Sequence, residues 1–544
     1  MGYIKSDNNR TSSSLGKTLF DFADTLSIRV PTSCGRTGEC HECIIQITEG
    51  IENLSEKKDL ESFLGPEFRL ACQAFINNDK EDVSFNVLRR QPKILETGKG
   101  ASFKLSPSIC IQDSQIIDKN SNRVLSEKIT PIYGMAVDLG TTTVVCSLID
   151  LLNGKIIGTS SFENPQRFGG SDTLNRISYE TTKFPGELKS VIISGLNFEI
   201  GELCKKNKIR RSHIYEMLVV GNTTMRDIFF GVDVASVGQK PYKSLTQLEL
   251  EDGKRETTSL SCDSHELGLR INKNGLIVSP PLISCHIGSD ITADLVAISA
   301  DIHEENFILL DVGTNTEIVI GNKENLVAAS CPAGPAFEGG EVRYAMPGYD
   351  GAIEKFEINN GDESFSTINS TPPQGICGSG LIDLLASLKS NSIINELGVL
   401  SDGSDYYELK NSNGIKISRA DMSALAQAKA ANYCGQSIAL KNSSIDINNF
   451  KKLYLSGGFA NYINVDNAIK IGFIIDTPNT EIVKIGNSAL QGAIMLLLDV
   501  SLRSKFDNLV KSIKHIELET DENFFEHFVE GCQFKELSIM QGNK

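Results

Sequence analysis

Two similar patterns of apolar and polar positions recur far apart in the chain. The first is the run Met135–Val137, a polar turn and the run Val144–Ile149. The second is the run Phe307–Leu310, a polar turn and the run Ile318–Ile320. Short apolar runs bounded by turn residues are typical of buried strands. The pattern therefore predicts two strand–turn–strand units that lie 173 residues apart.

The two turns share the sequence Asp-x-Gly-Thr-x-Thr, at Asp138–Thr143 and at Asp311–Thr316. A repeat on this scale predicts two similar half-domains that face each other. Glycine lets the backbone approach an oxyanion, threonine hydroxyls donate to it, and an aspartate at a strand end can hold Mg²⁺. We therefore expect Asp138 and Asp311 to hold Mg²⁺. The residues expected to bind nucleotide phosphates are Gly140, Thr141, Thr142, Thr143, Gly313, Thr314 and Asn315.

This pair of turns resembles the phosphate loops of the ATPase superfamily of actin, sugar kinases and heat-shock chaperones, and the sequence has no Walker A motif. The resemblance implies a duplicated α/β ATPase of the ribonuclease-H-like fold. It implies that Gly457 and Gly458, after the apolar run 452–456, lie at adenosine, and that Asp290 positions the attacking water. Asp290 can also be read as the N-cap of a helix running through Ala300.

A glycine-rich turn, Gly375–Gly380, precedes a helical run at Leu381–Leu388. A glycine turn at a helix N-terminus can bind an anion, so we expect Gly378 and Ser379 to lie near the nucleotide. The alternative is a tight turn that only lets the helix pack.

Four cysteines near the N-terminus have the spacing of an iron–sulfur site. Cys34, Cys40 and Cys43 follow the pattern C-x5-C-x2-C, and Cys72 comes later with 28 residues in between. Plant-type 2Fe–2S proteins use C-x4-C-x2-C…C, and the longer first gap resembles that of adrenodoxin-like ferredoxins. Four-thiolate zinc sites usually have two CxxC pairs, whereas this segment has one. We expect a 2Fe–2S cluster in a small α+β ferredoxin-like (β-grasp) domain, with His41 facing solvent.

Composition limits the possible partners. The formal net charge is −16, which argues against binding to nucleic acid or to an anionic membrane. The N-terminus has no apolar stretch of the signal-sequence kind, and no run reaches the ~20 apolar residues of a membrane span. The other nine of the 13 cysteines are scattered, so we expect small buried side chains in a reducing cytoplasm.

The patterns predict a multidomain chain with five parts. They are a 2Fe–2S ferredoxin-like domain at 1–90, a linker at 91–131, ATPase half-domain I at 132–301, ATPase half-domain II at 302–505, and a C-terminal tail packing on the ATPase at 506–544. A tether between the first two domains would let the redox part move, because the cost of closing a loop grows slowly with its length. The alternative is an ordered linker docked on the main domain, and the sequence does not decide between the two.

The combination of a ferredoxin module with this ATPase resembles the reductive activators of corrinoid proteins. The further matching runs are 221–225, 333–339, 347–354, 375–381, 428–431, 455–460, 486–493, 519–521 and 524–530. The chain departs from the usual pattern at His41-Glu42 in the cluster loop, at Thr316, where a glycine is common, and at Tyr349-Asp350.

The resemblance implies ATP-dependent delivery of one electron from the cluster to a corrinoid protein. Inactive Co(II) would become Co(I) for a cobamide-dependent methyltransferase. It also implies an upstream low-potential electron donor, a possible homodimer and an anaerobic host. The alternatives are an electron-transfer or scaffold protein on a non-hydrolysing ATPase fold, a kinase for a small acid or sugar, and an activator of a dehydratase.

Overall fold

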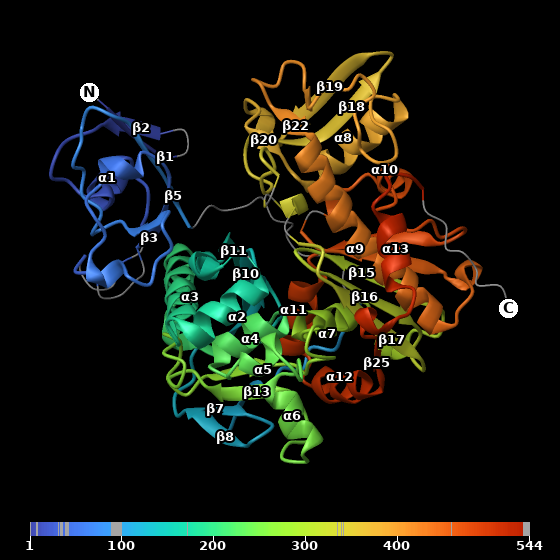
Figure 1. Ribbon diagram of the computed structural model, residues 1–544. Helices are drawn as coiled ribbons and strands as arrows, with labels where there is room; N and C mark the ends of the chain where they lie inside the picture. Colours follow the sequence, from blue (N-terminus) through green and yellow to red (C-terminus); the bar gives the residue numbers. More distant parts are fainter. Residues whose placement is uncertain are drawn as a thin grey trace.

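The computed structural model shows a small N-terminal unit beside a larger body with two lobes (Figure 1). The residues it describes are 2–6, 9–30, 32, 36–38, 43–88, 101–170, 172–334, 336–338, 340, 342–458 and 460–536. Cys34, Cys40 and the pair His41-Glu42 therefore lie outside the described residues. Among the helices that are described, none combines the length and the apolar composition needed to cross a membrane.

The N-terminal unit, residues 2–88, is one mixed sheet with a short helix. The strand order is β2-β1-β5-β3-β4, with β1 parallel to β5 and the other pairs antiparallel. A capping box of Thr18 and Asp21 begins α1, which buries four of its seven side chains. The bounds are β1 (Tyr3–Ser6), β2 (Asn9–Ser12), α1 (Leu19–Thr25), β3 (Ile44–Glu49), β4 (Phe68–Leu70) and β5 (Val83–Val87).

Part of the segment expected to be a linker is folded. Residues 109–126 form a three-stranded antiparallel sheet of β6 (Ile109–Gln112), β7 (Gln115–Asp118) and β8 (Arg123–Ser126). Ser108 is buried beside it and donates to the Glu216 carboxylate of the larger body at 2.8 Å. For this part of the segment the structure shows the ordered, docked linker, which is one of the two alternatives that the sequence left open.

Lobe one is built on a six-stranded sheet of order β11-β10-β9-β12-β14-β13. Its strands are β9 (Tyr133–Leu139), β10 (Thr143–Asp150), β11 (Ile156–Glu163), β12 (Ile214–Val220), β13 (Leu260–Asp263) and β14 (Leu276–Ser279). Its helices are α2 (Thr173–Thr182), α3 (Glu187–Lys206), α4 (Thr223–Phe230), α5 (Ala235–Gly238), α6 (Leu245–Glu251) and α7 (Ser289–Ala297).

Lobe two repeats the central part of this arrangement. Its sheet has the order β24-β23-β15-β16-β17-β25. In each lobe the strand before the Asp-x-Gly-Thr turn, β9 or β15, pairs antiparallel with the strand after the turn and parallel with a later strand. The strands are β15 (Phe307–Val312), β16 (Thr316–Gly321), β17 (Leu326–Cys331), β23 (Lys452–Ser456), β24 (Glu481–Gly486) and β25 (Lys514–His515).

The remaining elements complete lobe two and the seam between the lobes. A small sheet of β19-β18-β20 and the hairpin β21-β22 lie above lobe two, in yellow and orange in Figure 1. The strands are β18 (Ala352–Asn359), β19 (Asp362–Thr367), β20 (Gly375–Ile376), β21 (Tyr406–Glu408) and β22 (Lys416–Ser418). The helices are α8 (Gly378–Ser390), α9 (Arg419–Ser443), α10 (Val465–Lys470), α11 (Ser488–Leu498), α12 (Ser501–Ser512) and α13 (Phe524–Gly531).

One apolar core joins the two sheets. It contains Leu218 of β12, Ile291 of α7, Leu309 of β15 and Leu490 of α11, all fully or almost fully buried. Although α11 comes late in the chain, it packs against α7, β9 and β12 of lobe one. The two Asp-x-Gly-Thr turns therefore lie on two halves that share one apolar core.

Candidate functional site

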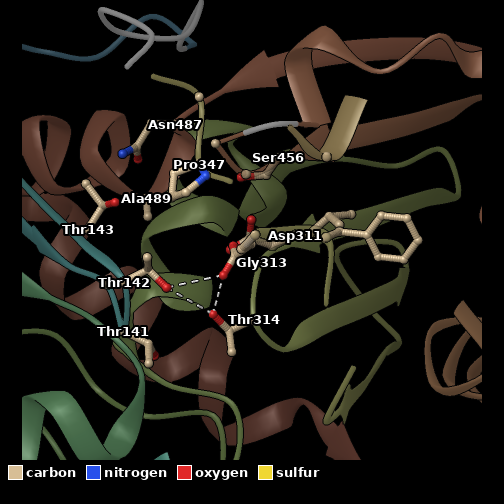
Figure 2. Close-up of a pocket in the computed structure, with 18 of the residues that line it drawn as sticks. Thr141, Thr142, Thr143, Asp311, Gly313, Thr314, Pro347, Ser456, Asn487 and Ala489 are labelled. Carbon is tan, nitrogen blue, oxygen red and sulfur yellow. Dashed lines mark hydrogen bonds between the residues drawn. The ribbon is translucent and has the colours of Figure 1, made fainter. Parts of the chain in front are cut away.

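A cavity of about 250 Å³ lies between the two lobes. Figure 2 shows side chains from both lobes pointing into it, among them Thr142 and Thr314. Every residue that the sequence predicts for the nucleotide lines this cavity. These residues are Asp138, Gly140, Thr141, Thr142, Thr143, Asp290, Asp311, Gly313, Thr314, Asn315, Gly378, Ser379, Gly457 and Gly458.

The turn of lobe one requires its glycine. A Cβ at Gly140 would lie 2.5 Å from the Thr143 carbonyl oxygen, so any larger residue would force the turn open. Gly457 is restricted in the same way: its φ is +110°, and a Cβ there would lie 2.1 Å from the Val312 carbonyl oxygen. Gly313 has no backbone or side-chain atom closer than 3.5 Å to an added Cβ. The two turns of the repeat are therefore not equally tight.

The two turns are joined by a carboxylate that sequence reasoning missed. The Thr142 hydroxyl donates to the Glu338 carboxylate at 3.2 Å, and the Thr314 hydroxyl donates to the same oxygen. Burial raises the pKa of Glu338. Glu338 lies in the run Ala333–Gly339, which matches the resembled family in sequence. Nothing in the sequence indicated a role for Glu338 within that run. A carboxylate here occupies hydroxyl donors that phosphate oxygens could otherwise use.

Acidic side chains crowd the cavity floor. Burial raises the pKa of Asp138 to about 7 and that of Asp290 to about 8, with nearby Asp311 adding to both shifts. Burial also raises the pKa of Asp294 and of Glu317. These groups favour a bound cation, which would relieve their repulsion. No three His, Cys, Asp or Glu side chains in the described part of the chain converge to hold a metal ion alone. A Mg²⁺ ion here would therefore need waters and phosphates as further ligands, as Mg²⁺ commonly does.

Two polar residues outside the predicted set donate hydrogen bonds to the buried carboxylates of Asp138 and Asp294. Asn487, the N-cap of α11, donates from its amide to the Asp138 carboxylate at 2.8 Å. Ser488 donates to Asp294 and to Ser456 of β23. The run Gly486–Ala493 is visible in the sequence, yet only the fold shows that this late segment reaches lobe one.

Asp290 lies in the first turn of α7 and lines the cavity. The helix begins after Gly288, which is its N-cap, so the alternative reading of Asp290 as the N-cap is wrong. The Asp290 carboxylate accepts a hydrogen bond from the backbone N–H of Ile291, the next residue of the helix, at 2.9 Å. The helix ends at Ala297, earlier than Ala300.

Three other sequence expectations have a structural outcome. Thr316 lies within β16, fully buried and paired with Val312 and Cys331, so it is not part of the phosphate-facing turn. Gly378 and Ser379 are the first residues of α8, and the Ser379 hydroxyl donates to the Glu354 carbonyl. Of the nine cysteines outside the N-terminal set, six are buried, and Cys110, Cys262 and Cys532 are partly exposed.

Two of the four predicted cluster cysteines are in the described residues. The sulfur atoms of Cys43 and Cys72 are 3.4 Å apart, too far for a disulfide of about 2.05 Å and near enough to share one metal centre. Both are buried in the core of the N-terminal unit. The Gln73 amide donates to the Cys72 sulfur at 3.3 Å and to the Arg36 carbonyl at 3.3 Å. The thiol pair and its N–H donor fit a cluster site.

Three family models match successive parts of the chain. A 2Fe-2S iron-sulfur cluster binding domain matches residues 4–77, the RACo middle region matches 133–305, and the C-terminal domain of RACo, the ASKHA domain, matches 305–542. The first match supports a 2Fe–2S cluster and the third supports nucleotide binding. The predicted fold class, a ferredoxin-like domain followed by a duplicated α/β ATPase, is confirmed.

Named relatives cover most of the chain. RamQ, a corrinoid activation enzyme from Eubacterium limosum, is 27% identical over 94% of this chain and 95% of its own length. A Co(II) methylated amine-specific corrinoid protein reductase from Methanosarcina barkeri is 24% identical over 72% of this chain and 75% of its own. A solved reductive activator for corrinoid, iron-sulfur protein has the same fold, with a TM-score of 0.71, 24% identity and 98% coverage of both chains. From its N-terminus onward, the chain is thus similar to a 2Fe-2S iron-sulfur cluster binding domain, to the RACo middle region and to the C-terminal domain of RACo, in that order.

Proposed function

We propose that this chain is an ATP-dependent reductive activator of a corrinoid protein. One electron passes to an inactive Co(II) corrinoid and restores the Co(I) form used by a cobamide-dependent methyltransferase. The observation that carries the proposal is the presence, in one chain, of a cluster domain and of a nucleotide cavity lined by two Asp-x-Gly-Thr turns. The names of the relatives from Eubacterium limosum and Methanosarcina barkeri support it.

The energetics explain why such a reaction uses ATP. When bound, a plant-type 2Fe–2S cluster supplies a one-electron carrier near about −400 mV. An uphill step of about 150 mV costs roughly 3.5 kcal/mol, at about 59 mV for each tenfold in the equilibrium constant. After one electron has passed to cobalt, an upstream low-potential donor reduces the cluster again. We infer that the reaction takes place in the cytoplasm.

The residues of the cavity have separate tasks in this proposal. The turns at Gly140–Thr143 and Gly313–Asn315 bind the phosphates, and Asp138 and Asp311 hold Mg²⁺ through water. Asp290 orients the attacking water for in-line displacement. Since the turns belong to different lobes, the presence or loss of the terminal phosphate changes how the lobes close. The corrinoid protein binds one closure state better, and this difference couples ATP to the electron.

The test uses the full chain with its cluster reconstituted, a Co(II) corrinoid protein and a strong reductant. We expect Co(I) absorbance to appear only when ATP is added. The Cys72→Ala variant should hydrolyse ATP without producing Co(I), and the Asp311→Asn variant should keep its cluster without producing Co(I). Equal reduction rates with and without ATP would exclude the proposal. Binding of ATP without hydrolysis would favour a scaffold role instead.

A further inference from the structure

The phosphate turn of lobe one is held by hydrogen bonds to its carbonyl oxygens. Asn164 donates from its side chain to the Gly140 carbonyl at 2.8 Å and from its backbone to the Thr142 carbonyl at 2.8 Å. Arg176 donates to the Thr141 carbonyl between them at 2.7 Å. Two residues thus fix three successive peptide groups of the turn. Asn164 and Arg176 are therefore the residues on which a change in the turn would act directly.

Arg176 is rigidly placed. It is 1% exposed, and besides Thr141 it contacts the Gly170 carbonyl and the Met225 sulfur, each at 3.0 Å. A buried guanidinium is costly unless its donors are paired, so these contacts leave it little freedom. Arg176 lies in the first half of α2 (Thr173–Thr182), so its hydrogen bond to Thr141 joins the turn directly to this helix.

The same two segments reach the N-terminal unit. Tyr179, one helical turn after Arg176 in α2, donates its hydroxyl to the Phe63 carbonyl at 2.6 Å. Phe168 lies in a short 3-10 helix (Pro165–Gly169) that follows directly on Asn164, and its ring meets the Phe63 ring edge to face at 5.6 Å.

Among the described residues, Phe63 links the N-terminal unit to lobe one through buried contacts. Phe63, Phe168 and Tyr179 are each at most 6% exposed, and they belong to one apolar core that runs from the N-terminal unit into lobe one. The exposed ion pair of Arg29 with Glu202 also joins the two units, but exposed pairs contribute little. The contact at Phe63 therefore governs how the cluster-bearing unit sits on the ATPase body.

We propose that α2 and the 165–169 helix couple the phosphate turn to the N-terminal unit, with Arg176 and Tyr179 as positioning residues. The occupancy of the turn by nucleotide phosphates then sets the placement of the cluster domain on lobe one. This inference rests on the proposed function, because it takes the turn at Gly140–Thr143 to bind nucleotide. It adds a second route for ATP control, which acts on the electron-donating side and does not pass through the corrinoid protein.

The test measures backbone hydrogen exchange at residues 62–65 in the full chain, with and without a non-hydrolysable ATP analogue. We expect the analogue to change exchange in wild type. Tyr179→Phe keeps the ring and removes one hydrogen bond, which should raise exchange at 62–65 by about threefold to tenfold and abolish most of the response to nucleotide. Phe168→Leu, in the 165–169 helix, should also raise exchange at 62–65 and reduce the response to nucleotide. Tyr407→Phe is the matched control, because it removes a hydroxyl bond to Glu363 in lobe two.

Two further measurements separate this inference from the proposed function. ATP hydrolysis by Tyr179→Phe should stay within twofold of wild type, while ATP-dependent cobalt reduction falls. If wild-type exchange at 62–65 does not respond to the analogue, or if Tyr179→Phe responds as wild type does, the coupling is overturned. In that case ATP-dependent cobalt reduction can still hold. If exchange responds as expected but ATP never supports cobalt reduction, the proposed function is wrong while the coupling inference stands.

Discussion

The hydroxyl oxygens of Thr142 and Thr314 are 3.3 Å apart, although the two residues are 172 positions apart in the sequence. One carboxylate oxygen of Glu338 accepts a hydrogen bond from each hydroxyl, and this contact connects lobe one to lobe two. Dashed lines in Figure 2 mark hydrogen bonds made by Thr142 and Thr314. If both turns bind phosphate, the carboxylate of Glu338 and a phosphate oxygen compete for the same donors. Glu338 thus places a carboxylate among the hydroxyl donors that the phosphates would use.

We expect Glu338→Gln to bind ATP about tenfold more tightly than wild type does, because the substitution removes a negative charge from the phosphate site. Tenfold corresponds to about 1.4 kcal/mol. The effect on ADP should be smaller, since ADP lacks the γ-phosphate. Fluorescent-nucleotide titration measures both affinities, and Glu354→Gln serves as the control because its side chain lines the same cavity. Weaker ATP binding in Glu338→Gln would mean that Glu338 helps to hold the metal ion.

Asp311→Asn should lower the rate of ATP hydrolysis by at least about 100-fold, because a charge that holds Mg²⁺ is lost. The fold should remain, since the amide has nearly the same shape and removes one of several mutually repelling carboxylates. Steady-state phosphate release measures the rate, and thermal unfolding checks the fold. Asp402→Asn, at an exposed turn where Asp402 bonds only locally to Ser404, is the control. Unchanged hydrolysis in Asp311→Asn would remove Asp311 from the metal site.

The stability of the nucleotide-free protein should depend on pH through Asp138. Its pKa is raised by burial from 3.8 to about 7, so between these values the folded state binds more protons than the unfolded state. The stabilising contribution of Asp138 is therefore present at low pH and is lost as the pH rises toward about 7. Urea unfolding at pH 5 and pH 8 should show Asp138→Asn gaining stability relative to wild type at the higher pH. A difference that is the same at both pH values contradicts the prediction.

Gln73→Leu should lower the reduction potential of the cluster, because N–H donors to cluster sulfur raise it. The Gln73 amide donates to the Cys72 sulfur, and the substitution removes that donor at similar volume. Redox titration followed by electron paramagnetic resonance measures the midpoint. The spectrum should keep the form of the wild-type cluster, which shows that the four cysteines still bind. An unchanged midpoint would show that this amide has no effect on the cluster.

The residues of the two turns could be picked out from the sequence because the Asp-x-Gly-Thr repeat is local and both copies stand at strand ends. The sequence could not reveal Glu338 or Asn487 as cavity residues. Glu338 follows the strands of lobe two in a short 3-10 helix, and Asn487 reaches Asp138 from 349 positions away. Such contacts join residues that are far apart in the sequence, and a local sequence pattern does not indicate which of them meet in the fold.

The sequence left open whether the expected linker is folded, and the reason is different. Its strands β6–β8 have four residues each and alternate poorly between apolar and polar positions. Short strands of this kind gain their stability from the surface on which they pack, here through Ser108 and Glu216. The prediction of the cluster cysteines rests on ligand spacing, which is a local signal and does not depend on how the rest of the chain packs.

The return of α11 to lobe one has a consequence for the order of synthesis on the ribosome. Leu497 packs beneath Gly134 of β9, and Gly492 passes so close to Ala293 that a Cβ would lie 1.8 Å from its carbonyl oxygen. The cluster domain can be complete once residue 88 has emerged, whereas lobe one stays unfinished until residue 498. At about 5–20 residues per second this interval lasts roughly 20–80 s. A nascent chain can therefore receive its iron long before it has a nucleotide cavity.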